Sequence, residues 1–128
     1  MSKLKILFIL SIVITATLFA QTGVNTQHLT AQEFKKALET NKYLLIDVRT
    51  PEEFAQGHIT GAININVNDE DFVKKIKDKT QKQKMLAIYC RSGRRSKVAI
   101  NAIEPLKLQI VELNDGIMGW LQAGFKVN

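Results

Sequence analysis

Short apolar runs that alternate with helical patterns set the strongest constraint on how this chain can fold. Four runs, YLLIDV, AINI, MLAIY and LQIVEL, are apolar along most of their length rather than at every second residue. Continuous apolar strands are typical of parallel sheets, because helices cover both faces of such a sheet. The pattern therefore predicts an α/β fold, a single domain with a central parallel sheet of about five strands and helices on both faces.

Helix signals lie between these runs. Thr30 and Glu33 have the spacing of a capping box, and Thr50 followed by Pro51 is typical of a helix start. The stretch 68–79 carries acidic residues at its start and lysines at its end, which is the distribution that the helix dipole favours. The predicted helices cover residues 31–39, 51–56 with Thr50 as cap and Gly57 as stop, 68–79, 94–106 and 115–124.

The first twenty residues differ from the rest of the chain. Lys3 and Lys5 precede a run from Ile6 to Ala20 that carries no charge. The run is shorter than the roughly 20 apolar residues that span a bilayer as a helix, and it is typical of a secretory signal peptide. We expect residues 1–20 to be removed, leaving a domain over 21–128 that is periplasmic or otherwise exported from a bacterial cell. Retention as a membrane anchor is the alternative.

Charge and composition exclude several classes of partner. The formal net charge of +6 falls to +4 once Lys3 and Lys5 leave with the signal. The remaining lysines cluster on helical stretches without interleaved aromatic residues, which indicates a solvated face rather than a nucleic-acid site. The two histidines, His28 and His58, lie far apart in the sequence, so we expect no metal site and no cofactor. A monomer is the default for a chain of this size.

The only cysteine, Cys90, follows the apolar run MLAIY and precedes a helical pattern. Ligands of parallel α/β sheets bind where strands end and helices begin. The loop CRSGRRS can direct backbone N–H groups inward, and Gly93 permits the tight curl that this requires. Together with Arg91, Arg94 and Arg95, these dipoles should favour a thiolate and attract an anion. The alternative is an inert buried cysteine with arginines that point into solvent.

Three segments carry a family resemblance. LLIDVRTPEEFAQGHITGAINI, IYCRSGRRS and LNDGIMGW resemble the rhodanese-like sulfurtransferases in order, spacing and residue type, over about residues 30–125. With its signal-like start, the chain is most similar to the small exported rhodaneses of the periplasmic phage-shock type. The resemblance implies that Cys90 accepts a sulfane sulfur from a donor such as thiosulfate. The resulting persulfide then passes the outer sulfur to cyanide or a thiol acceptor, without a cofactor.

The resemblance also assigns roles to individual residues. Cys90 is the nucleophile, and Arg95 is similar to the family arginine that closes the loop and contacts the donor. The residues implied in substrate binding are Arg91, Ser92, Gly93, Arg94 and Arg95. The residues implied in support are Asp47 and Arg49, as a charged pair at a strand end, His58, at the rim, and Ser96.

Two other functions remain open. Cysteine-dependent phosphatases and arsenate reductases also place a cysteine in an anion-binding loop before a helix, but their arginine lies one position further along the loop. This chain has Ser96 at that position and Arg95 before it, which gives a shorter loop than phosphate requires. The second possibility is a rhodanese-like module that carries sulfur or binds a partner protein without turning over small donors.

Overall fold

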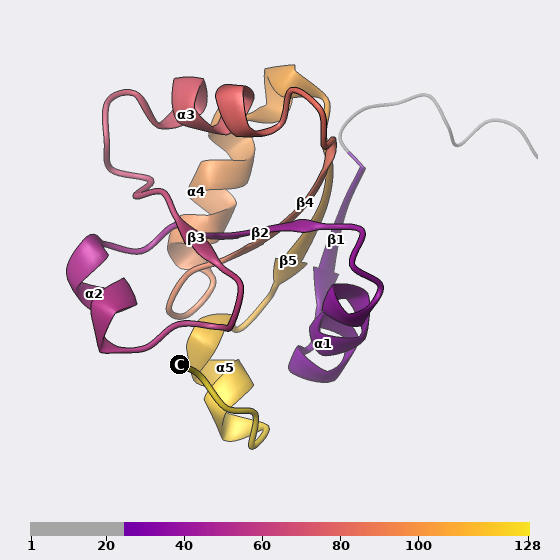
Figure 1. The fold of residues 1–128 in the computed structure, drawn as a ribbon, viewed down its shortest axis with the longest axis vertical. Helices are drawn as coiled ribbons and strands as arrows, with labels where there is room; N and C mark the ends of the chain where they lie inside the picture. The colour runs from indigo at the N-terminus through magenta and orange to yellow at the C-terminus, as the bar shows by residue number, and fades with distance from the viewer. Residues whose placement is uncertain (1–24) are drawn as a thin grey trace, which may run out of the picture.

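The computed structural model describes residues 25–128 and shows a five-stranded sheet with helices on both faces (Figure 1). The predicted signal peptide at 1–20 lies outside the described residues. All four strand pairs are parallel, and the strand order is β1-β5-β4-β2-β3. The strands are β1 (Asn25–Leu29), β2 (Leu44–Asp47), β3 (Ile63–Asn64), β4 (Met85–Tyr89) and β5 (Gln109–Leu113). The predicted α/β fold is thereby confirmed.

The helices form two layers around this sheet. They are α1 (Ala31–Glu39), α2 (Pro51–Gln56), α3 (Phe72–Lys79), α4 (Arg94–Ala102) and α5 (Gly116–Gln122), with a short 3-10 helix η2 (Glu104–Leu106). Helices α3 and α4 contribute side chains to one core cluster, and α1 and α5 contribute to the other. Within residues 25–128, no helix has the length and apolar character needed to cross a membrane.

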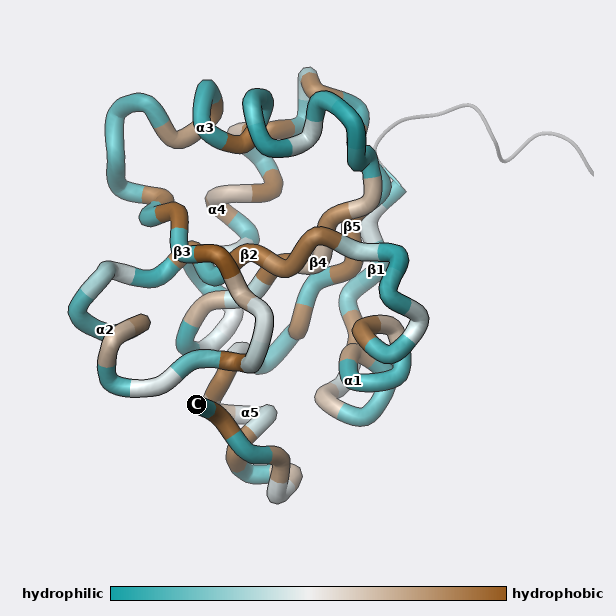
Figure 2. The backbone as a smooth tube through the Cα atoms, viewed as in Figure 1, coloured by the Kyte–Doolittle hydropathy of each residue, from teal (hydrophilic) through white to brown (hydrophobic). Residues whose placement is uncertain are grey.

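Alternate residues of the central strands fill the two cores. Leu86 and Ile88 of β4 pack with α3 and α4, whereas Ala87 and Tyr89 pack with α1 and α5. Figure 2 shows this as a hydrophobic band along the strands, with hydrophilic segments on the surrounding helices. Burial on both faces explains why these strands are apolar throughout.

Both predicted helix starts have the expected geometry. The Glu33 backbone N–H donates to Thr30 Oγ1 at 3.2 Å, and the Thr30 N–H donates to the Glu33 carboxylate at 2.9 Å. The same reciprocal pair joins Thr50 and Glu53 at the start of α2, where Pro51 occupies the first turn. Each capping box satisfies N–H groups that no helical carbonyl can reach.

Three elements differ from the prediction. Strand β1 was not anticipated, because its sequence NTQHL lacks an apolar run and the strand pairs only with β5 at the sheet edge. Helix α3 begins at Phe72 rather than near residue 68, since Asn66 Oδ1 accepts from the Asn68 N–H at 2.9 Å and closes a turn there. The predicted helix over 94–106 ends at Ala102 and continues as η2, because Pro105 has no N–H to donate.

Candidate active site

Cys90 lies at the carboxyl end of β4, directly before the loop that leads into α4. The residue is only 1% exposed. The Gly93 backbone N–H donates to Cys90 Sγ at 3.1 Å, so the loop turns a backbone dipole toward the sulfur. A donor in this position stabilises negative charge on sulfur. The site therefore lies at the sheet edge where parallel α/β folds bind their ligands.

The shape of the loop depends on Gly93 and on α5. Gly93 has φ +103°, and a Cβ there would lie 2.1 Å from the Asn114 carbonyl oxygen, so only glycine fits. From α5, the Ile117 N–H donates to the Cys90 carbonyl at 2.9 Å and the Met118 N–H donates to the Arg91 carbonyl at 3.1 Å. The first turn of α5 thus fixes the loop by holding two of its carbonyl groups.

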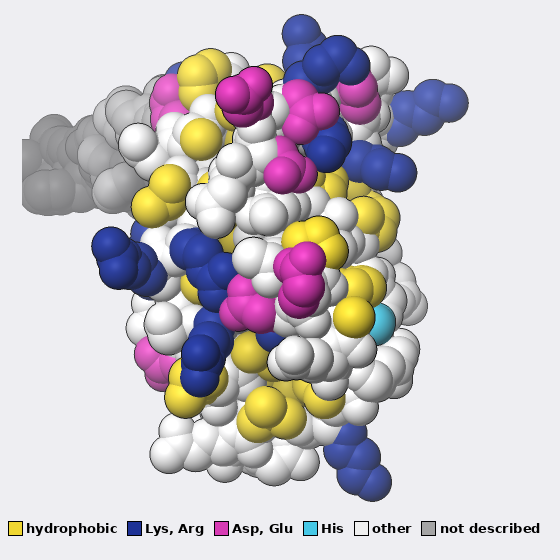
Figure 3. Space-filling view, turned by 90° about the vertical axis from the view of Figure 1, so that its left-hand side faces the viewer, with side chains coloured by type: hydrophobic (Ala, Val, Ile, Leu, Met, Phe, Trp, Pro, Cys, Tyr) yellow, Lys and Arg dark blue, Asp and Glu magenta, His cyan; other side chains and the backbone are white. Residues whose placement is uncertain are grey.

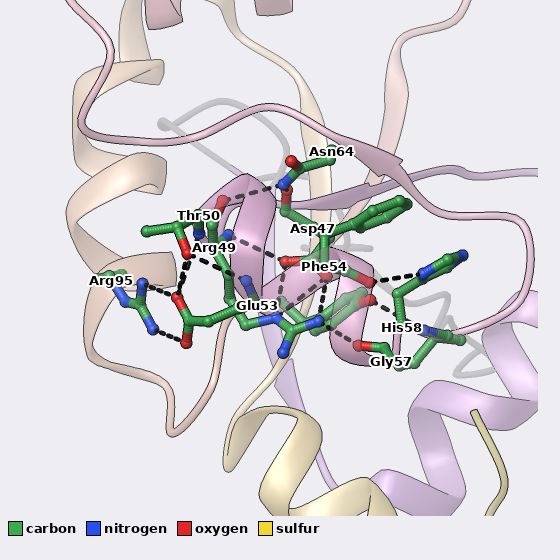
Figure 4. A network of polar contacts seen from close by, with 11 residues as sticks. Asp47, Arg49, Thr50, Glu53, Phe54, Gly57, His58, Asn64 and Arg95 are labelled. Carbon is green, nitrogen blue, oxygen red and sulfur yellow. Dashed lines mark hydrogen bonds and ion pairs between the residues drawn. The ribbon is translucent and has the colours of Figure 1, made fainter. Parts of the chain in front are cut away.

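The loop arginines fall into two groups. Arg91 and Arg94 are exposed to solvent. Arg95, predicted to contact the donor, forms a bidentate ion pair with Glu53 of α2, at 2.7 and 2.8 Å (Figure 4). The hydrogen bonds from Arg95 lower the pKa of Glu53 from 4.5 to about 2, and the same bonds raise the pKa of Arg95. Arg95 therefore bridges the end of the loop to α2.

Glu53 is a site residue that the sequence analysis did not name. Its carboxylate accepts hydrogen bonds from Thr50 as well as from Arg95, so it caps α2 and holds the loop at the same time. The capping-box spacing of Thr50 and Glu53 was visible in the sequence. It gave no sign of the contact with Arg95, which lies 42 residues further along the chain.

Asp47 and Arg49 form a buried ion pair at the end of β2, with Arg49 Nη2 2.7 Å from the Asp47 carboxylate. The same Nη2 atom donates to the Gly57 carbonyl at 2.7 Å (Figure 4). Burial opposes the charge on Arg49, but hydrogen bonds and charge from Asp47 outweigh it and raise the pKa of the guanidinium. The pair joins the strand end to the segment that follows α2.

His58 lies on that segment, half-buried. Its ring stacks on Phe54 with a centroid distance of 3.7 Å, and Nδ1 lies 3.0 Å from the Phe54 carbonyl oxygen. Its hydrogen bonds in the described part of the chain join it to α2 and the C-terminal residue Asn128, and none reaches Cys90. The structure thus places His58 against α2 and does not bring it together with the thiol.

Ser96 lies on the inner side of α4 and belongs to a second buried network. Its hydroxyl group contacts the Gly93 carbonyl, at 3.1 Å, and the carboxylate of Glu112. Glu112 is fully buried and also contacts Lys97 Nζ, at 3.2 Å, and His28 Nδ1. The Gly93 carbonyl also accepts from Lys97 Nζ at 3.2 Å. This network supports the start of α4 from beneath, and the sequence analysis missed Glu112 because it lies within an apolar run.

No group of three or more His, Cys, Asp or Glu side chains that could hold a metal ion occurs among residues 25–128. The groups that the structure places at the site are the Cys90 thiol, the backbone dipole of Gly93 and the loop arginines. A cysteine in a short loop between a parallel strand and a helix, with an N–H directed at its sulfur, defines an α/β domain with a cysteine loop at the carboxyl edge of its sheet.

Comparison with known proteins identifies the family. Residues 30–123 match the rhodanese-like domain family, and the chain belongs to it. A sulfurtransferase of Allochromatium vinosum is 30% identical over 94 residues, which cover 73% of this chain and 85% of that protein. A rhodanese-related protein of Thermoplasma volcanium superposes with a TM-score of 0.69 at 29% identity, covering 80% of this chain and 97% of the other.

Some relatives are much longer. A probable molybdopterin-synthase adenylyltransferase of Porphyra purpurea is 29% identical over 111 residues, which cover 84% of this chain. The match spans only 28% of that relative. The same domain therefore also occurs as part of larger proteins.

Proposed function

We propose that this protein is a thiosulfate sulfurtransferase that works through a persulfide on Cys90. The observation that carries the proposal is the Gly93 N–H directed at Cys90 Sγ, in a loop that also bears Arg91, Arg94 and Arg95. A buried sulfur nucleophile needs stabilisation of its negative charge, and a dianionic donor needs positive charge at the entrance. The A. vinosum relative that is named a sulfurtransferase supports the same reaction class.

The proposed reaction is a double displacement. The Cys90 thiolate attacks the outer sulfur of thiosulfate, the S–S bond of the donor breaks, and sulfite leaves with the electron pair. An acceptor such as cyanide then attacks the outer sulfur of the persulfide, and the Cys90 thiolate leaves. Thiosulfate and cyanide together become sulfite and thiocyanate, and the enzyme returns to its starting state.

Intact mass of the purified protein tests this proposal. Incubation with thiosulfate should add one sulfur atom, and cyanide should remove it with release of thiocyanate. The Cys90→Ala variant should gain no sulfur and release no thiocyanate, while retaining the circular dichroism spectrum and melting temperature of a folded domain. A wild-type protein that gains no sulfur would instead support a carrier or partner-binding module. A Cys90→Ala variant that still turned over would contradict the role of Cys90.

We also propose that residues 1–20 act as an export signal. The support is the lysine-flanked apolar run from Ile6 to Ala20. Amino-terminal sequencing of protein recovered from a bacterial periplasm should begin near Gln21. Recovery of protein that still begins at Met1 in the membrane fraction would favour an anchor.

A further inference from the structure

A groove of about 470 Å³ borders the cysteine loop between α2 and α5. Arg91, which follows the nucleophile, lines it, and so does Glu53, which holds Arg95 at the other end of the loop. Figure 1 shows α2 and α5 next to the loop that precedes α4. The groove thus adjoins the loop through residues that contact both of its ends.

Much of the groove wall is apolar. Ile117, Met118 and Leu121 of α5 line it together with Val127 near the C-terminus. Met118 and Leu121 are 51% and 50% exposed, among the most exposed large apolar side chains of the described chain, and their spacing places them on one side of α5. Figure 3 shows hydrophobic side chains beside both charge types on the face that contains α2. Exposed apolar surface next to a site indicates a ligand with an apolar part.

Thiosulfate and cyanide do not match this groove. Both are small hydrated anions of a few atoms, and the apolar side chains of α5 offer neither of them a hydrogen bond. The volume lies within the range of about 300–1,000 Å³ typical of sites for small organic ligands. The groove is therefore larger and less polar than the proposed donor or cyanide requires.

The charged residues of the groove limit the chemical class of the ligand further. Arg91 is exposed at the groove, and none of the ion pairs found within residues 25–128 includes it. The other charged residues of the wall are already paired, Glu53 with Arg95 and Arg49 with Asp47. The cation that remains at the rim favours a ligand with a carboxylate at one end.

We propose that the groove binds the sulfur acceptor, and that this acceptor is a small organic thiol with an apolar body and a carboxylate. The proposal rests on the proposed function, since the acceptor is needed only if Cys90 carries a persulfide. The apolar body lies along Met118 and Leu121, and the carboxylate pairs with Arg91. The thiol sulfur attacks the outer sulfur of the persulfide, the Cys90 S–S bond breaks, and the Cys90 thiolate leaves with the electron pair. The proton of the acceptor thiol ends on the transferred sulfur, so the acceptor becomes a persulfide without net oxidation.

The test separates the two half-reactions. Persulfide is first formed on Cys90 with thiosulfate and measured by mass, so failure at that step concerns the proposed function alone. The loaded protein is then mixed with mercaptohexanoate, mercaptohexanol or mercaptoethanol, and the rate constants of sulfur loss are compared. Wild type should prefer mercaptohexanoate to mercaptohexanol, which lacks the carboxylate, and prefer both to mercaptoethanol, which lacks the apolar body.

Two variants test whether Leu121 and Arg91 cause the preference for mercaptohexanoate. Leu121→Ser should lower the rate constant for mercaptohexanoate about tenfold relative to that for mercaptoethanol, because it removes apolar contact area. Arg91→Gln should remove the preference for mercaptohexanoate over mercaptohexanol. Val98→Ser is the matched control, since Val98 is 58% exposed on α4 and does not line the groove. Of Leu121→Ser and this control, only Leu121→Ser should change the ratio of the rate constant for mercaptohexanoate to that for mercaptoethanol. An equal change of this ratio in Leu121→Ser and Val98→Ser would overturn the proposal.

A binding measurement needs no turnover. Hexanoate, which has no thiol, should shift the methyl NMR signal of Met118 in the wild-type protein, and it should do so less in Arg91→Gln. An unchanged signal would overturn the proposal even if the persulfide forms. A Met118 signal that shifts on dilution instead of with hexanoate would assign the groove to a contact between copies and would also overturn it.

Discussion

At the scale of single residues, Arg95 supports the cysteine loop through its ion pair with Glu53 as much as through its positive charge. Arg95→Ala should lower kcat/KM for thiosulfate about ten- to a hundredfold, equivalent to about 1.4–2.8 kcal/mol of transition-state stabilisation. The variant removes a positive charge from the loop that is proposed to attract the donor, and it releases the loop from Glu53. Steady-state kinetics with thiosulfate and cyanide measure this effect. Arg94→Ala, at an exposed neighbouring position, is the control, and an equal loss in both variants would show that charge alone matters.

Glu112 is expected to matter for stability. Glu112→Ala should lower the free energy of unfolding by about 1–3 kcal/mol, because the buried Ser96 hydroxyl loses an acceptor and the half-exposed Lys97 loses its ion-pair partner. Glu104→Ala removes the partner of Lys107 from an exposed pair and should cost less than about 1 kcal/mol. Urea denaturation measures both values. Similar losses of unfolding free energy in Glu112→Ala and Glu104→Ala would contradict a structural role for the buried carboxylate of Glu112.

The residues that could be identified from sequence are those whose chemistry is local. Cys90 and its arginines stand together in one loop, so their proximity follows from chain order. Glu53 and Glu112 reach the loop only through packing of α2 and β5 against it, from 42 residues away in the case of Glu53 and Arg95. A single sequence contains no signal for such a contact.

At the scale of elements, the start of α5 determines the shape of the cysteine loop. Gly116 has φ +66°, and a Cβ there would lie 2.2 Å from the Arg91 carbonyl oxygen. Gly116→Ala should therefore destabilise the domain by more than about 2 kcal/mol and slow persulfide formation, because the loop carbonyls must move. Gly124 also has positive φ, at +90°, but a Cβ there meets no atom within 4 Å. Gly124→Ala should cost only the backbone strain of about 1–2 kcal/mol and leave the persulfide rate unchanged.

Thermal melting and the rate of sulfur gain by mass measure these two variants. An unchanged rate in Gly116→Ala would show that the loop tolerates displacement of α5. Equal destabilisation of both variants would show that backbone strain, and not the close approach to Arg91, dominates.

Elements with an apolar pattern or a cap signal in their own sequence could be predicted. Elements that depend on pairing or packing with a neighbouring element could not. Strands β2, β4 and β5 are buried on both faces, so their apolar runs identify them. Strand β1 is polar and exists because its backbone pairs with β5 from Asn25 to Leu29. The Thr30–Glu33 capping box and the Thr50–Pro51 signal located the starts of α1 and α2, whereas α3 has no side-chain cap and begins later than its charges indicated.

At the scale of the whole molecule, the two helical layers meet the site at the carboxyl edge of the sheet. Cys90 belongs to the core shared with α3 and α4, and Ile117 of α5 belongs to the other core. The hydrogen bond between them, from the Ile117 N–H to the Cys90 carbonyl, therefore links the two layers. The ion pair of Glu53 and Arg95 adds α2 to this junction.

This junction should make the stability of the domain sensitive to acid. Because the pKa of Glu53 is lowered from 4.5 to about 2, its contribution is fully present above pH 4.5 and is lost as the pH falls toward 2. The pair is partly exposed, so we expect a contribution of about 1 kcal/mol, screened further by salt. Urea denaturation of wild type and Glu53→Gln should show a difference in unfolding free energy near neutral pH that shrinks below pH 4.5. A difference that stays constant down to pH 2 would assign the stabilisation to hydrogen bonds that the amide retains, and not to the charge of Glu53.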